Sequence, residues 1–432
     1  MSAARLPRTV WAWALYDFAN SAFTTLIVTF VYATFFTKAM AADEIAGTAL
    51  WSRGVALTAV LVVLLSPFLG AVADRTGTRK RMLLATTVVC VLATAGLFLP
   101  APGEALLALT LFVVANVAFE MSAVFYNAYL PEIAPPGRVG RVSGIGWGLG
   151  YGGGLLALVV ALAVLVQPET PPFGLDKDSF EHVRAACLLV AGWYALFSVP
   201  AFLVLAEPPA TNPARVTTVL RESAAALRQT VRDLQSYRQI VRLLVARLVY
   251  NDGLNTIFAF GAIYASGTFG FTTSQIILFG IVLNVAAGIG AVGLGFLDDR
   301  IGGKRTVMIS IALLVAATIV AVLTPAAGGL WAAGILIGIA AGPCQSASRS
   351  LLARFVPPDK ESEFFGFFAF TGKAAAFAGP LLFGAATVAF DSQRAGVATV
   401  LIAFALGAVL LMRVDEAAGV AASGRAAAPP DA

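Results

Sequence analysis

The polar motif Gly70-Ala-Val-Ala-Asp74-Arg75-Thr-Gly77-Thr-Arg79-Lys80-Arg81 recurs in the second half of the chain as Gly295-Phe-Leu-Asp-Asp299-Arg300-Ile-Gly302-Gly303-Lys304-Arg305. Asp74 and Asp299 are 225 positions apart (299 − 74), and Pro135-Pro136 returns as Pro357-Pro358 at an offset of 222 (357 − 135). Each motif stands between two long apolar segments. Repetition at equivalent places predicts two similar halves that share one orientation.

The composition places both halves in a membrane. Of the 432 residues, 59% are hydrophobic and 12% charged, whereas about 25% are charged in soluble domains. This excludes a disordered chain, a solvated repeat and a nucleic-acid-binding domain, so nucleic acid is not expected as a partner. Apolar segments long enough to cross a bilayer are expected at 11–36, 54–73, 82–99, 105–129, 143–166, 185–206, 239–266, 275–297, 306–324, 329–352, 364–389 and 395–412.

The predicted fold is an all-α polytopic membrane protein with twelve transmembrane helices in two parallel six-helix repeats. Residues 1–206 form an N-terminal six-helix bundle, and 239–413 form a C-terminal one. A polar stretch, 207–238, is expected to be a partly helical cytoplasmic linker, and 414–432 a disordered cytoplasmic tail. We expect a monomer whose surroundings are the lipid bilayer.

The basic residues predict the orientation. When the N-terminus is placed inside, the outward loops hold 5 of the 29 Lys and Arg residues, and the inward side takes the rest, including Arg349 and Arg354. The positive-inside rule therefore favours both termini in the cytoplasm. The outward basic residues are Lys38, Arg53, Lys177, Arg184 and Arg394.

The repeated motif resembles the loop signature of the major facilitator superfamily. Glycines in it permit a tight turn and close helix approach, and Asp can cap or pair across the loop. The resemblance implies alternating access, with both loops acting as a conformational latch for the outward-open state. The alternative is that the basic residues only fix topology. The expected latch residues are Gly70, Asp74, Arg75, Gly77, Arg79, Lys80, Gly295, Asp299, Arg300, Gly302, Lys304 and Arg305.

A narrower resemblance rests on residues 11–23, Trp-Ala-Trp-Ala-Leu-Tyr-Asp-Phe-Ala-Asn-Ser-Ala-Phe, and on 250–256, Tyr-Asn-Asp-Gly-Leu-Asn-Thr. These segments are similar to the vacuole-effluxer branch of the superfamily, named for fungal vacuolar amino-acid exporters that act in autophagy. The resemblance implies amino-acid efflux, and for a bacterial member a location in the inner (plasma) membrane. Bacteria have no vacuole, so the cargo of such a member need not be the same.

Polar and charged residues inside the predicted spans are functional candidates, because charge is costly in a bilayer unless it faces a cavity or a partner. Arg247 and Lys373 can attract a substrate carboxylate. Asp17, Glu120 or Asp252 can carry a coupling proton. The structural alternatives are a helix cap for Asp17, a static ion pair for Glu120 and a surface-reaching side chain for Arg247. The expected substrate and coupling residues are Asp17, Asn20, Ser21, Glu120, Arg247, Asn251, Asp252, Asn255 and Lys373.

Signatures of an enzyme are missing from the sequence. There is no Walker-type phosphate loop, the three cysteines lie apart in apolar runs, and the chain has one histidine. We therefore expect no catalytic residues, no metal and no cofactor. The predicted function is secondary active transport of a small polar solute, with an amino acid favoured, by proton-coupled export. The alternatives are a drug or sugar carrier, or a non-transporting membrane receptor or scaffold.

Overall fold

The structure is a computed structural model that describes residues 6–207, 216–232, 235–374, 376 and 378–425, and the regular elements in this part are all helices. Ten of the described helices are long and apolar enough to cross a membrane. Two more, α4 (Arg79–Gly96) and α10 (Arg238–Phe269), lie beside them. Helix α4 begins with three basic residues and α10 carries several polar ones, so both are less apolar. Together they give twelve spanning positions.

The N-terminal half contains six long helical runs. The first, Arg8–Met40, starts as an α-helix and continues with wider π-helical turns beyond Ala22. The elements of this half are α1 (Arg8–Ala22), η1 (Phe23–Phe30), α2 (Tyr32–Phe35), η2 (Phe36–Met40), α3 (Glu44–Thr76), α4, α5 (Ala105–Ala128), α6 (Leu130–Ile133), α7 (Val139–Ala161), η3 (Leu162–Val166), η4 (Pro172–Gly174) and α8 (Glu181–Val204).

The C-terminal half repeats this arrangement after helix α9 (Val216–Arg232). The predicted span 364–389 lies within the candidate membrane span Glu361–Ala389, of which α14 and α15 are the described helices. The elements of this half are α10, α11 (Thr273–Ile301), α12 (Gly303–Leu323), α13 (Ala327–Phe355), α14 (Glu361–Ala374), α15 (Ala378–Ala389), α16 (Gln393–Met412) and α17 (Glu416–Ala422).

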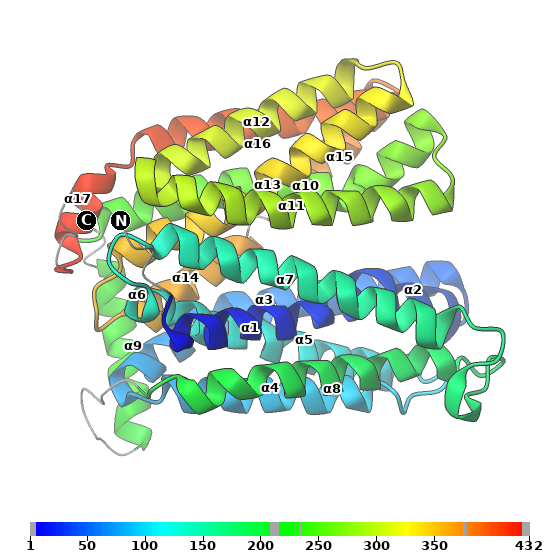
Figure 1. Cartoon of the computed structure of the whole chain (residues 1–432), viewed down its shortest axis with the longest axis horizontal. Helices are drawn as coiled ribbons and strands as arrows, with labels where there is room; N and C mark the ends of the chain where they lie inside the picture. The colour runs from blue at the N-terminus through cyan, green and yellow to red at the C-terminus, as the bar shows by residue number, and fades with distance from the viewer. Residues whose placement is uncertain (1–5, 208–215, 233–234, 375, 377, 426–432) are drawn as a thin grey trace.

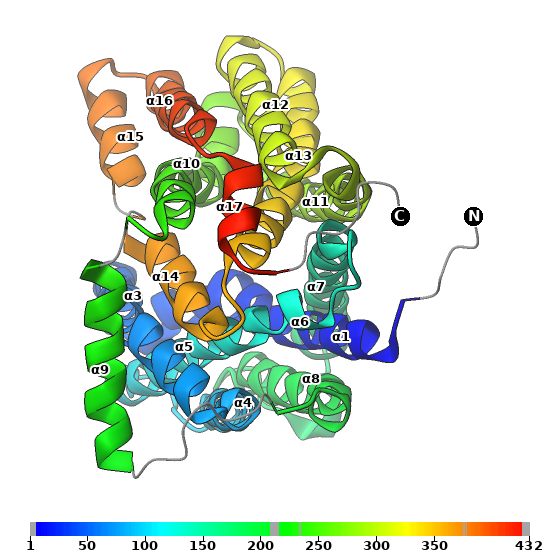
Figure 2. The same cartoon turned by 90° about the vertical axis from the view of Figure 1, so that its left-hand side faces the viewer.

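The halves lie side by side with their helices roughly parallel (Figure 1). Helix α1 begins and α17 ends at one end of the bundle, which we call the terminal end, and the opposite end is the far end. Helix α9 runs across the terminal end, and α17 lies there close to the boundary between the halves (Figure 2). The halves meet mainly where α3 packs on α14 and where α7 packs on α11.

The predicted disordered tail is wrong for residues 414–425. The Asp415 carboxylate caps α17 by accepting a hydrogen bond from Ala418 N (3.0 Å). Glu416 accepts hydrogen bonds from the backbone N–H groups of Gly303 and Lys304, both 2.9 Å. A charged side chain bonded to a helix N-terminus holds this segment in place. Residues 426–432 of the predicted tail, and 208–215 and 233–234 of the predicted linker, lie outside the described residues.

Candidate functional site

A cavity of about 740 Å³ lies between the two halves, bounded by the α1–η1 run and α7 on one side and by α10, α11 and α13 on the other. It runs from Ser21, in the middle of the first span, to Ala33 near the far end. Hydroxyl, amide and aromatic side chains supply its polar character, and none of the described residues that line it is charged. These side chains include Ser21, Thr24, Thr25, Thr29, Trp51, Trp147, Tyr151, Asn284 and Gln345.

Glycines of α7 allow this wall of the cavity to form. A Cβ atom at Gly150 would lie 2.8 Å from Ser21 Oγ, and one at Gly153 would collide with the carbonyl oxygen of Phe18. On another face of α7, a Cβ atom at Gly144 would collide with the carbonyl oxygen of Ala291 in α11. Glycine therefore lets α7 approach α1 and α11 backbone to backbone.

An ion pair joins the two halves inside the bundle. Lys373 Nζ of α14 lies 2.6 Å from Glu120 Oε1 of α5, and both side chains are largely buried, with 34% and 17% exposed. The sequence analysis gave an ion pair as the structural alternative for Glu120. The structure brings these two predicted residues together.

The predicted residues of α10 face α13, α14 and α15. Buried Arg247 donates to Phe368 O (2.7 Å) and Thr371 Oγ1 (3.1 Å), and its guanidinium carbon lies 3.5 Å from the centre of the Phe368 ring. Asn251 accepts a hydrogen bond from Gln345 (3.1 Å), which lines the cavity. Arg247 is thus held within the C-terminal half. The structural alternative required its side chain to extend to the membrane surface, and it does not.

Asp252 is buried beside the start of α15. A Cβ atom at Gly379 would lie 3.0 Å from its Oδ2 atom, and its Oδ1 atom has no hydrogen-bond partner among the described residues. Asn255, one turn further, is half-buried, and no hydrogen bond from its side chain to the described part of the chain is present. These two residues are not joined to the Glu120–Lys373 pair by a described contact.

A second ion pair crosses between the halves nearer the terminal end. Asp17 Oδ2 lies 3.3 Å from Nη1 of Arg349 in α13. The buried guanidinium of Arg349 also donates to Ser143 Oγ (2.9 Å), Ser143 O (2.7 Å) and Asn127 Oδ1 (3.0 Å). It lies 4.9 Å from the ring centre of Trp13. The neighbouring predicted residue Asn20 is buried, and its amide oxygen is 3.5 Å from Ser21 Oγ.

Sequence analysis missed Arg349 as a site residue and assigned it to the basic residues that set topology. It lies in the last two turns of α13, with the motif Ser-Ala-Ser-Arg-Ser around it. Small polar neighbours at a helix end are a signal that the arginine meets another helix closely. Ser143, one of its partners in the N-terminal half, was not predicted either.

The first polar motif closes the terminal end against the C-terminal half. Asp74 accepts hydrogen bonds from the backbone N–H groups of Ser362 (3.0 Å) and Glu363 (2.8 Å) in the first turn of α14. Gly70 is required there, because a Cβ atom would collide with the carbonyl oxygen of Ser362. A carboxylate at a helix N-terminus is favoured by the helix dipole and by the unpaired N–H groups.

Arg79 is the centre of the charged contacts around Asp74. Its guanidinium is 2% exposed and lies 2.6 Å from Glu132, 3.2 Å from Asp74 and 3.0 Å from Glu361 of the opposite half. It also donates to Ser362 Oγ at 2.9 Å. An arginine with five donors suits such a convergence of acceptors.

The second motif makes the equivalent contact in the opposite direction. Asp299 accepts hydrogen bonds from the backbone N–H groups of Gly140 (2.8 Å) and Arg141 (3.2 Å), at the start of α7. Arg354 Nη2 lies 2.8 Å from the adjacent Asp298 and 3.8 Å from Asp299. The α11–α7 contact thus mirrors the α3–α14 contact.

The other predicted latch residues have more local surroundings. Gly77 (φ 63°) and Gly302 (φ 92°) have positive φ at the ends of α3 and α11, where glycine is unstrained. Gly295 packs against α7. Arg75 pairs with Glu222 of α9 at 3.1 Å, and the Lys80 N–H group donates to Glu207 at 2.9 Å. Lys304 Nζ donates to Met412 O, whereas the side chains of Arg300 and Arg305 are exposed.

The comparisons with known proteins agree with this architecture. Residues 43–139 and 136–423 match the family described as "Vacuole effluxer Atg22 like". The uncharacterized MFS-type transporter YxiO of Bacillus subtilis is 29% identical over 418 residues, which are 94% of each chain. Autophagy-related protein 22 of Cryptococcus neoformans is 28% identical over 296 residues, covering 63% of this chain and 52% of the relative. The chain thus spans about half the length of the fungal relatives it matches.

Solved structures share the fold. The proton:xylose symporter XylE superposes with a TM-score of 0.73 at 14% identity, covering 94% of this chain and 95% of the symporter. The human organic anion transporter MFSD10 superposes with a TM-score of 0.70 at 17% identity, covering 94% and 99%. The expected superfamily and the twelve-helix fold are therefore confirmed. The chain is an integral membrane protein that belongs to the vacuole effluxer Atg22-like family, whose members are transporters of the major facilitator superfamily and not enzymes.

Proposed function

We propose that this transporter moves a small polar solute by alternating access, with an amino acid as the favoured cargo. The terminal end faces the cytoplasm in this proposal, as the distribution of basic residues predicts. Contacts between the halves gather at the terminal end, around Asp74 and Asp299, and the cavity extends to the far end. This arrangement corresponds to an outward-facing state, which the two polar motifs stabilise.

The Glu120–Lys373 pair is the observation that carries the choice of cargo. It is a salt bridge between two halves that must move apart or rotate during transport. A zwitterion offers the same two charges, so its carboxylate can replace Glu120 at Lys373 while its ammonium group replaces Lys373 at Glu120. Such an exchange leaves no charge unpaired in the low-dielectric interior.

Coupling to protons is assigned to the buried carboxylates. Asp252 is the preferred carrier, because its Oδ1 atom has no partner among the described residues and its charge is expensive to bury. Asp17 is the second choice, since Arg349 already neutralises it. Export is the proposed direction because the family is named for an effluxer.

A sugar carrier is the second candidate. The described cavity lining is uncharged and combines the aromatic rings of Trp51, Trp147 and Tyr151 with the amides of Asn284 and Gln345. Such a lining suits a neutral polyhydroxylated solute, which stacks on rings and hydrogen-bonds to amides. This candidate needs no exchange at Glu120 and Lys373.

Counterflow in liposomes separates the two candidates. Purified protein is reconstituted, and labelled amino acids and labelled sugars are tested with and without a pH gradient. We expect saturable amino-acid exchange that is lost in Glu120→Gln and Lys373→Met but kept in Glu169→Gln and Lys38→Met. These two controls remove the same charges from exposed positions.

Each outcome has a defined meaning. Amino-acid exchange that survives both interior substitutions overturns the zwitterion exchange, and sugar exchange without amino-acid exchange selects the second candidate. Accumulation driven by the pH gradient in wild-type protein, and lost in Asp252→Asn, supports proton coupling through that residue. Wild-type protein that exchanges substrate but does not accumulate it when a pH gradient is applied rejects it.

A further inference from the structure

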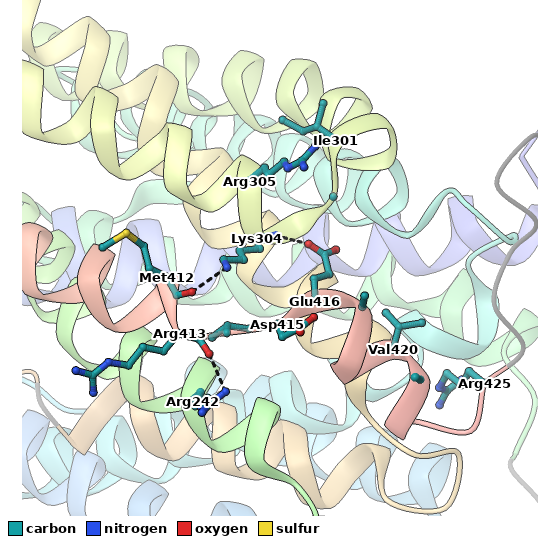
Figure 3. Close-up of a pocket in the computed structure, with 14 residues that line it drawn as sticks. Arg242, Ile301, Lys304, Arg305, Met412, Arg413, Asp415, Glu416, Val420 and Arg425 are labelled. Carbon is teal, nitrogen blue, oxygen red and sulfur yellow. Dashed lines mark hydrogen bonds between the residues drawn. The ribbon is translucent and has the colours of Figure 1, made fainter.

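A basic pocket of about 940 Å³ lies at the terminal end of the C-terminal half, away from the transport cavity. It is an open hollow lined by the start of α10, the start of α12, the last turn of α16, and α17 (Figure 3). Five cationic side chains line it: Arg242, Lys304, Arg305, Arg413 and Arg425. Two acidic residues, Asp415 and Glu416, also line it.

The acidic groups are already engaged. Asp415 caps α17. Glu416 accepts two backbone hydrogen bonds at the start of α12 and lies 3.0 Å from Arg354. In the described part of the chain neither carboxylate forms an ion pair with a basic residue of the pocket, and among these basic residues only Arg425 has an acidic partner, Glu361.

The remaining cations keep unused donors. Lys304 and Arg242 each donate one side-chain hydrogen bond, to Met412 O (3.0 Å) and Arg413 O (2.9 Å), as Figure 3 shows. The side chains of Arg305 and Arg413 have no hydrogen-bond partner among the described residues. Cationic side chains with unused N–H donors in the described part of the chain thus line one open pocket. Topology alone needs basic residues near this end, but it does not need them to line one pocket.

An apolar surface continues from the pocket along the bundle. Ile309, one turn after Arg305 on α12, is 39% exposed, and Val409, one turn before Arg413 on α16, is 45% exposed. Met412, at the mouth of the pocket, is 56% exposed. Helices α12 and α16 pack on each other at the periphery of the bundle (Figure 2). A ligand that fits both surfaces has an anionic head and a hydrocarbon tail.

We infer that this pocket binds the phosphate of an anionic phospholipid, whose acyl chains lie along α12 and α16. Basic pockets between transmembrane helices are suited to such headgroups, and arginine forks match phosphate oxygens. Free phosphate has the same charged group but would make no contact with the apolar surface. Because α17 forms one wall, the bound lipid also holds the segment whose Arg425 reaches the Pro131 carbonyl oxygen of the N-terminal half (3.3 Å).

The test measures lipid binding to the full chain in detergent, without reference to transport. Thermal stabilisation is titrated with phosphatidylglycerol, with zwitterionic phosphatidylethanolamine, and with glycerol 3-phosphate as the soluble head. We expect saturable stabilisation by phosphatidylglycerol alone. A basic residue near an anionic membrane surface is worth about a fivefold change in affinity, so Arg305→Gln/Arg413→Gln is expected to bind about 25-fold more weakly.

The matched control is Arg8→Gln/Arg238→Gln, which removes two exposed arginines of the terminal end that do not line this pocket. Its affinity is expected to equal that of the wild type. Equal loss in both double variants overturns the site in favour of general electrostatic attraction. If phosphatidylethanolamine or glycerol 3-phosphate stabilises the wild-type protein as much as phosphatidylglycerol does, the anionic-lipid assignment is overturned. This comparison uses wild-type protein alone, so it holds even where a variant fails to fold.

Discussion

Asp74 and Asp299 occupy equivalent positions in the two halves, and each accepts backbone hydrogen bonds from the first turn of a helix in the opposite half. The partner of Asp74 is α14, and the partner of Asp299 is α7. Both contacts lie at the terminal end. The two halves are therefore locked together twice, by the same chemistry and in opposite directions.

Removing the charge of either aspartate is expected to weaken closure at this end. A hydrogen bond to a charged acceptor is worth about 1.5–3 kcal/mol, so Asp74→Asn and Asp299→Asn should each shift the equilibrium toward the open terminal end by roughly tenfold. Spin labels at positions 81 and 305, one in each half, report the separation by electron–electron double resonance. Asp391→Asn, at an exposed site, is the control and should leave the distance distribution unchanged.

Glycines at the α3–α14 contact are expected to stabilise only the state in which these two helices are packed together. A Cβ atom at Gly70 would collide with Ser362 O, and one at Gly366 with Ser66 O, so Gly70→Ala and Gly366→Ala should favour the longer spin-label distance. Gly192→Ala is the matched change in α8, where no atom lies within 4 Å of the added methyl group. It should leave the distance as it is and raise the melting temperature slightly through helix propensity. If Gly70→Ala kept the short spin-label distance, α3 and α14 could make room for the methyl group while the terminal end stayed closed, and the prediction would be wrong.

Arg349 is expected to be more important to stability than any surface arginine. Removing one partner of a buried ion pair destabilises by about 3–5 kcal/mol, because the other charge stays buried. Arg349→Gln should therefore lower the melting temperature more than Asp17→Asn/Arg349→Gln does, although the double variant carries more changes. A double variant that melts below the single one would mean that the two side chains act separately.

The last described residues are expected to strengthen the closed state. Ending the chain after Arg413 removes Glu416 from the start of α12 and Arg425 from Glu361 and Pro131. The population of the long spin-label distance should then rise by about tenfold, because this corresponds to the free energy of one to two hydrogen bonds to charged groups. Ending the chain after Arg425 keeps these contacts and should behave as the full chain does. If both truncations gave the same result, the contacts of α17 would have no part in closure.

The fold could be predicted from the sequence, and so could the presence of polar and charged residues inside the spans. Hydropathy and the repeated motif are local signals that can be read along the chain. The sequence predicted that Asp74 would cap or pair across the loop, and Asp74 lies 3.2 Å from Arg79 there. Its other partners, the N–H groups of residues 288 and 289 positions away, were not foreseen. Backbone donors have no sequence signature. The Asp17–Arg349 pair spans 332 positions, and the arginine was assigned to topology because a basic residue at a helix end satisfies that rule equally well.

The tail is the clearest case of an overlooked local signal. Asp415-Glu416 precedes an alanine-rich stretch, which is the pattern of an N-cap followed by an acidic first turn. The sequence analysis nevertheless placed this stretch in a disordered tail. The packing of α17 on α10 and α13, which the sequence alone does not reveal, provides the stability that seven helical residues lack by themselves.

The position of the two aspartate contacts in the bundle also determines how easily their hydrogen bonds are broken. Helix starts at the end of a membrane bundle lie next to water, so the N–H groups and carboxylates that separate there can be solvated at once. The same bonds broken at mid-membrane would leave their groups in hydrocarbon, where each costs several kcal/mol. Fastening the halves at their rim makes the closure readily reversible, which a carrier needs and a static scaffold does not.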